Sequence, residues 1–137
     1  MAQTAGYSGK PLAQKLGLKD GMAAAAIAAP EQYDELIVDF PVKHVKTPGA
    51  LKGDFDFLHL FCRETAELEA ELEPVFGHLA EGGMIWVSWP KKSSKLWRDM
   101  TEDDVRRICL PMGLVDVKVC AVDADWSGLK LMRRKTG

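Results

Sequence analysis

Short apolar runs alternate along this chain with stretches in which apolar residues recur every three or four positions. The runs have the length and the flanking Gly, Pro or charged residues that are typical of strands covered on both faces. Four of them predict strands, at residues 22–29, 42–47, 55–62 and 84–89. The first is so rich in alanine that a helix would also fit, but its length and the flanking Gly21 and Pro30 favour a strand.

The longer-period stretches predict helices at residues 11–16, 31–37, 65–80 and 101–112. Pro74 should kink or split the third helix, because proline removes a backbone hydrogen bond. Leu79–Gly83 is expected to be the end of this helix and a glycine turn. Thr101 is a good N-cap for the fourth helix, and Gly113 is its expected C-cap.

The end of the chain has the pattern of a hairpin. Valines alternate with polar residues over 115–122, and a second strand at 127–134 follows the turn 123–126. Strands that alternate with helices imply a parallel sheet covered by helices. The predicted fold is therefore α/β: a three-layer, Rossmann-like, mainly parallel sheet of about six strands with a C-terminal antiparallel hairpin. The 137 residues suffice for one domain, 1–137, with 1–5 expected to be a flexible tail.

Two segments of this pattern, Phe55–Phe61 and Glu81–Val87, together with the order of elements, resemble the S-adenosylmethionine methyltransferases at the level of the fold. The resemblance implies a cofactor at the carboxyl ends of the first strands, held by a glycine-rich turn and an acidic residue. Here the turn 27–31 contains no glycine, and the second strand ends in Val45-Lys46-Thr47-Pro48 without an acid. We therefore predict no cofactor, and S-adenosylmethionine is a disfavoured alternative.

A second resemblance covers nearly the whole chain, from Gly6 to Lys135. Its motifs are GYSGKPL from Gly6, MIWVSWPKK from Met84, GLVDVKVCAVD from Gly113 and WSGLK from Trp126. They are similar to a family of small bacterial proteins that is filed only as a domain of unknown function. This resemblance implies a bacterial protein but brings no activity and no functional residues.

Other motifs for specific chemistry fail on spacing. Gly6–Pro11 has two residues between its glycines instead of the four of a phosphate-binding loop, although an anion site at the following helix start stays open. Ser88 lacks the flanking glycines of a nucleophile elbow. The three histidines, His44, His59 and His78, have no metal-ligand spacing, and His59 is expected to be a core residue bonded to backbone.

Composition narrows the classes of partner and location. The chain is 47% hydrophobic and 28% charged with a net charge of −2, which makes a nucleic-acid partner unexpected. No apolar run has the roughly 20 residues of a membrane span, and no secretory signal is recognised. The odd number of cysteines, three without a close pair, indicates reduced thiols. We expect a cytoplasmic protein without a membrane association or a metal.

The basic segment after the fourth strand is the strongest functional candidate. It contains three lysines between Trp89 and Trp97, followed by Arg98, and no acidic residue up to Arg98. A parallel strand would place it at the carboxyl edge of the sheet, where this fold builds its pockets. The candidate ligand-binding residues are Ser88, Trp89, Lys91, Lys92, Lys95 and Trp97. The alternative is a solvated basic loop whose tryptophans pack into the core.

Three functional hypotheses follow. The first is a non-catalytic protein that binds an anionic small molecule or a protein partner at the carboxyl edge. The second is an enzyme, a divergent S-adenosylmethionine-dependent methyltransferase or another transferase. The third is a subunit that docks on a larger assembly through the hairpin edge or the basic segment.

Overall fold

The computed structural model describes residues 12–38 and 40–134, so the Gly6–Pro11 motif lies outside the described residues. The helices are α1 (Leu12–Leu16), α2 (Tyr33–Leu36), α3 (Thr65–Phe76) and α4 (Glu102–Cys109). The strands are β1 (Ala24–Ile27), β2 (Lys43–Val45), β3 (Phe55–Phe61), β4 (Leu79–Pro90), β5 (Leu114–Ala121) and β6 (Trp126–Arg133). Every predicted strand and helix is present, in the predicted order.

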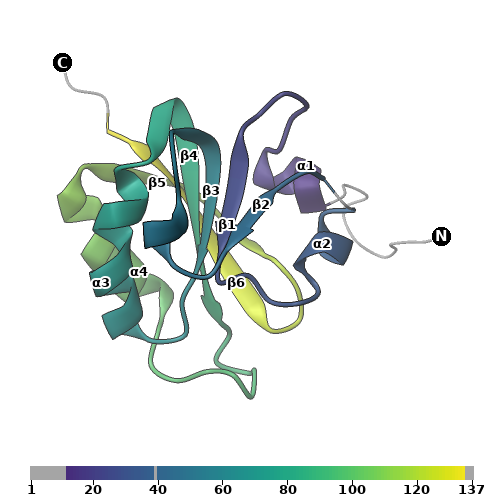
Figure 1. The fold of residues 1–137 in the computed structure, drawn as a ribbon. Coiled ribbons are helices and arrows are strands. Elements are labelled where there is room, and N and C mark those ends of the chain that lie inside the picture. The colour runs from purple at the N-terminus through teal and green to yellow at the C-terminus, as the bar shows by residue number, and fades with distance from the viewer. Residues whose placement is uncertain (1–11, 39, 135–137) are drawn as a thin grey trace.

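All six strands form one sheet in the order β2-β1-β3-β4-β6-β5. The strands β2, β1, β3 and β4 are parallel, whereas β6 is antiparallel to both of its neighbours. The helices α3 and α4 lie on one face of the sheet and α1 and α2 on the other (Figure 1). The predicted α/β class and Rossmann-like architecture with an antiparallel C-terminal hairpin are thus confirmed.

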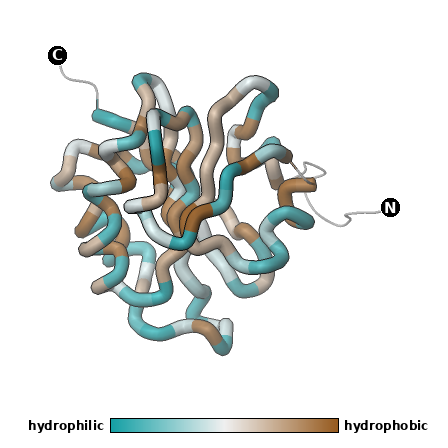
Figure 2. The backbone as a smooth tube through the Cα atoms, viewed as in Figure 1, coloured by the Kyte–Doolittle hydropathy of each residue, from teal (hydrophilic) through white to brown (hydrophobic). Residues whose placement is uncertain are grey.

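The core divides into two clusters, one on each face of the sheet. Alternation along β4 assigns its side chains: Ile85, Val87 and Trp89 belong to the cluster under α3 and α4, and Met84 and Trp86 to the cluster under α1 and α2. The apolar colour in Figure 2 accordingly concentrates on the strands, while the outer helices and loops carry most of the polar colour.

The segment Leu79–Gly83 does not form the predicted helix end and turn. The helix α3 runs unbroken through Pro74 and ends at Phe76, and residues 79–83 already belong to β4. Leu79 pairs with Phe55 of β3, and the register shifts before Phe57. Gly82 takes a φ of +78° within this irregular stretch. Pairing with β3 therefore decides the conformation of residues 79–83. The sequence did not show this, because Leu79 continues the helical spacing of apolar residues in α3.

Candidate functional site

The basic segment after β4 is held against the turn of the β5–β6 hairpin. The backbone N–H of Lys91 donates to the Asp125 carbonyl at 2.8 Å, and the Ser94 hydroxyl donates to the Asp125 carboxylate at 2.9 Å. Asp123 shapes this turn by accepting the backbone N–H groups of Asp125 and Trp126. The turn-forming role predicted for Asp123 is confirmed, and the hairpin fixes where the lysines begin.

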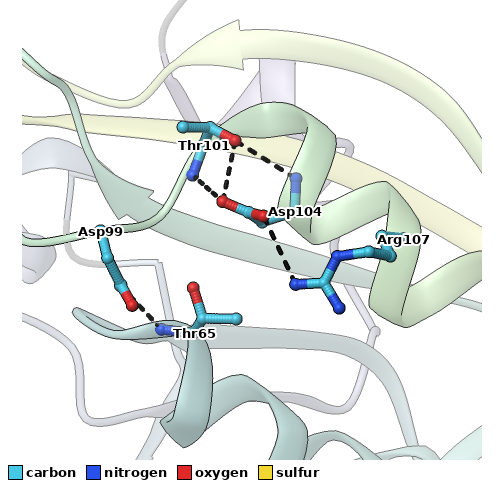
Figure 3. Close-up of polar contacts among 5 residues, drawn as sticks. All are labelled: Thr65, Asp99, Thr101, Asp104 and Arg107. Atoms are coloured by element: carbon cyan, nitrogen blue, oxygen red, sulfur yellow. Dashed lines mark hydrogen bonds and ion pairs between the residues drawn. The ribbon is translucent and has the colours of Figure 1, made fainter.

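The other end of the segment is fixed by the starts of α3 and α4 (Figure 3). Asp99 accepts the backbone N–H of Thr65 at 3.0 Å. Thr101 caps α4: its hydroxyl accepts the backbone N–H of Asp104, and the Asp104 carboxylate accepts the backbone N–H of Thr101 at 3.1 Å. The Thr101 hydrogen bond lowers the pKa of Asp104, which keeps this cap charged.

A surface pocket of about 430 Å³ lies between these two anchored segments. It is on the side of the sheet that α3 and α4 cover, because its residues Trp89 and Met100 belong to that core cluster. Its lining residues come from the end of β4, the start of α4 and the start of β6: Trp89, Lys91, Lys92, Met100, Thr101, Glu102, Asp103 and Ser127. The volume falls within the range of small-molecule sites.

The charges that border this pocket are of both signs. Among residues 12–38 and 40–134, no carboxylate lies within 4.0 Å of the ammonium groups of Lys91 and Lys92, and no cation within 4.0 Å of the Asp103 carboxylate. Glu102 differs, since it forms an ion pair with Arg106 one turn along α4. Two ammonium groups are therefore free to meet a ligand.

Three of the six candidate residues meet at this pocket: Trp89, Lys91 and Lys92. Lys95 and Trp97 are exposed in the same segment but do not line it. The Trp97 indole donates to the Met100 carbonyl at 2.9 Å, and 37% of the residue stays exposed. It supports the segment that carries Met100 rather than covering the pocket.

Ser88 lies on the opposite face of β4, fully buried, in a chain of three polar side chains. Its hydroxyl oxygen is 2.7 Å from His59 Nε2, and the Tyr33 hydroxyl is 2.9 Å from His59 Nδ1. His59 is the predicted core histidine, but its partners are side chains and not backbone. A Cβ on Gly128 of β6 would lie 3.2 Å from the Ser88 hydroxyl, so glycine leaves space for this chain.

Burial sets the ionisation of these three hydrogen-bonded side chains. It lowers the pKa of His59 to about 3 and raises that of Tyr33 far above its ordinary value. Both groups are therefore neutral at pH 7, and none of the three side chains has measurable solvent exposure. The distances are those of a nucleophile, base and orienting group, but all three side chains are buried. The hydrogen bonds among these side chains connect α2, β3 and β4.

The carboxyl ends of β1 and β3, the switch point of this sheet, lack the glycine-rich turn of the usual cofactor pose. Ala28 follows β1 with a φ of +60°, where glycine would be unstrained. The Gln32 side chain donates to Asp123 at 2.9 Å and so ties the β1–α2 loop to the hairpin. Phe61 and Trp126 pack edge to face at 5.1 Å at the same carboxyl ends.

Sequence reasoning missed the half of the pocket that precedes and begins α4. The sequence predicts Thr101 only as the cap of a helix, and it does not single out Met100 or Asp103 as ligand-binding residues. Their signal was that only the short segment 91–101 separates the end of β4 from the start of α4, which keeps the start of α4 near the same sheet edge. Ser127 could not be found in this way, because its place depends on the pairing of β6 with β4.

Other site classes find little support among the described residues. No group of three His, Cys, Asp or Glu side chains in 12–38 and 40–134 could hold a metal ion. Cys62 and Cys109 are buried free thiols, whereas Cys120 is only partly buried. Burial raises the pKa of all three thiols. In this part of the chain no helix is long and apolar enough to cross a membrane.

No family model and no curated protein matches the chain in sequence. Solved structures do match its fold, and several of them are methyltransferases. A putative type 11 methyltransferase from Sulfolobus solfataricus matches with a TM-score of 0.61 and 13% identity, over 91% of this chain and 90% of that one. Magnesium protoporphyrin IX methyltransferase from Synechocystis PCC 6803, solved with bound S-adenosylmethionine, matches with a TM-score of 0.60 and 13% identity, over 90% and 74%. The chain therefore has the methyltransferase-like Rossmann fold, and these identities extend to the fold alone.

Proposed function

We propose that this protein binds an anionic small molecule in the pocket between the end of β4 and the start of α4, without catalysing a reaction on it. The observation that supports this function is the pair of lysines, Lys91 and Lys92, that border the pocket without a carboxylate within 4.0 Å in the described structure. Ammonium groups on both sides of a phosphate or carboxylate form charge-assisted hydrogen bonds. The pocket volume favours a small molecule over a protein partner.

The composition of the pocket lining supports binding rather than catalysis. The lining side chains of the described structure include no histidine and no cysteine. The serine–histidine–tyrosine chain is on the other face of β4 and is sealed from solvent. Thr101 and Asp104 are engaged with each other in the helix cap. The lining groups can thus hold and orient a ligand.

A direct binding experiment tests the site. We expect calorimetric binding of inorganic phosphate or of small phosphorylated and carboxylated metabolites to fall at least tenfold in the double variant Lys91→Glu/Lys92→Glu. The matched control is Lys95→Glu, which changes the same charge in the same segment but outside the pocket, and should change affinity less than threefold. Equal losses in both variants would mean that general charge, and not this pocket, attracts the anion.

The fold gives specific support to a second candidate, S-adenosylmethionine-dependent methyl transfer, because its solved neighbours include a methyltransferase with that cofactor bound. Ala28, the Gln32–Asp123 bridge and the absence of an acid at the end of β2 oppose the usual pose. Calorimetry with S-adenosylmethionine and its demethylated product tests this candidate. Ala28→Val places a larger side chain in the β1–α2 loop. Binding of S-adenosylmethionine that is lost in this variant but survives Lys91→Glu/Lys92→Glu would favour the methyltransferase.

A further inference from the structure

The two segments that line the pocket carry opposite charges that do not neutralise each other directly. Lys91 and Lys92 follow β4, whereas Glu102 and Asp103 form the first turn of α4. No ion pair in the described structure joins one segment to the other within 4.0 Å. The 430 Å³ pocket is bordered by both.

The acidic residues at this border differ in whether their carboxylates already have a partner. Asp104 makes the helix cap and Glu102 binds Arg106, so the carboxylates of both are engaged. Asp103 is exposed, and its carboxylate has no hydrogen bond or ion pair to another described residue. The cap of α4 therefore does not need its carboxylate, and Asp103 leaves one negative charge available at the pocket.

We propose that the ligand is a zwitterion, with a phosphate or carboxylate held by Lys91 and Lys92 and a cationic group held by Asp103. This inference rests on the anion site proposed above and specifies its ligand class. A purely anionic ligand would gain the attraction of the lysines but would also be repelled by Asp103. A second, positive end removes that repulsion and adds an attraction. Trp89, which is 5% exposed, borders the pocket and is an apolar residue available to the uncharged middle of such a ligand.

Matched ligand pairs test this inference. O-phosphoethanolamine and ethyl phosphate differ only in an ammonium group, as do L-phenylalanine and 3-phenylpropanoate. We expect the zwitterion of a pair to bind at least tenfold more tightly than its partner by calorimetry, which corresponds to about 1.4 kcal/mol. In Asp103→Asn this preference should disappear, and the simple anion should bind at least as well as to the original protein.

The control variant is Glu69→Gln, which removes an exposed carboxylate on α3 away from the pocket and should keep the tenfold preference. Circular dichroism of each variant confirms that it is folded. Equal binding of both members of each pair, unchanged by Asp103→Asn, overturns the zwitterion and leaves the anion site in place. If no probe binds at millimolar concentration, the anion site itself is wrong, and this inference with it.

Discussion

At the scale of single residues, the most consequential group is the buried imidazole of His59. Both ring nitrogens are engaged, Nδ1 with Tyr33 and Nε2 with Ser88, so either neutral tautomer is satisfied. Phe61 stacks on the imidazole at 4.2 Å and leaves no approach for water from that side. The histidine is therefore stable only in its neutral form.

We expect this burial to make stability depend on pH in the acid range. The pKa of His59 is lowered to about 3, whereas an unfolded chain has its ordinary value of about 6.5. Between these two pKa values the unfolded state binds one more proton than the folded state. The free energy of unfolding therefore has its full value above about pH 6.5. Below about pH 6.5 the free energy of unfolding falls by about 1.4 kcal/mol per pH unit. Urea unfolding from pH 7 to pH 4 measures this slope.

The variant His59→Gln is the control for that measurement, because it removes this titrating group and leaves the other histidines. Its slope over the same pH range should be smaller by the contribution of about one proton. Identical slopes in the two proteins would show that His59 is protonated in the folded state or is accessible to water.

Ser88 separates a structural role from a binding role. Ser88→Ala leaves His59 Nε2 without a partner in a buried site, so we expect a loss of about 1–3 kcal/mol of stability. Ligand binding at the pocket should change less than threefold in this variant, because Ser88 faces the other side of β4. Ser93→Ala, at an exposed position nearby, is the control and should be neutral in both measurements. Loss of binding without loss of stability would return Ser88 to the ligand site.

At the scale of elements, the start of α4 decides the shape of the pocket. The Thr101–Asp104 box ends the segment after β4 and begins the helix at one defined position (Figure 3). Gly113, with a φ of +100°, ends the 3₁₀ turn that extends the helix, as the sequence predicted for a C-cap. Both ends of this element were readable locally, because capping depends on residues within three or four positions.

We expect Thr101→Ala to destabilise the protein by about 0.5–2 kcal/mol, since the backbone N–H of Asp104 loses its acceptor. Thr101→Ser keeps the hydroxyl and should restore most of this loss. Thermal and urea unfolding measure stability, and calorimetry measures ligand affinity. If both variants unfold like the original protein, the cap does not contribute to the stability of α4.

At the scale of the whole molecule, the order of strands sets which parts are most stable. The strands β3 and β4 are central and buried, whereas β2 is a three-residue strand at one edge with mostly exposed side chains. The strand β5 forms the other edge, and Val117 and Val119 on it are 48% and 43% exposed. Native-state hydrogen exchange should therefore show the strongest protection in β3 and β4.

We expect the amides of β2 and the outer edge of β5 to exchange at least a hundredfold faster than those of β3, because edge strands open without unfolding the core. Mass spectrometry after pulse labelling of peptides resolves these strands. Uniform protection over the six strands would mean that the sheet opens only as one unit, or that the edges are covered by another chain.

The sequence predicted local features better than long-range ones, and the two halves of the candidate site illustrate this difference. Lys91 and Lys92 follow an apolar strand, so their place at a sheet edge could be predicted from the chain direction alone. Ser88 is two residues before the end of β4, and only alternation along β4 decides its face. Lys95 and Trp97 are close in sequence but do not line the pocket.

The sequence alone determined the α/β class, the order of the elements, the caps of α4 and the basic segment after β4. Each of these depends on apolar periodicity or on contacts between residues a few positions apart. Only the tertiary structure decided that Leu79–Gly83 joins β4, that His59 bonds Ser88 and Tyr33, and that α4 completes the pocket. These features depend on which distant segments pair across the sheet, and a pattern within one segment does not specify its partner.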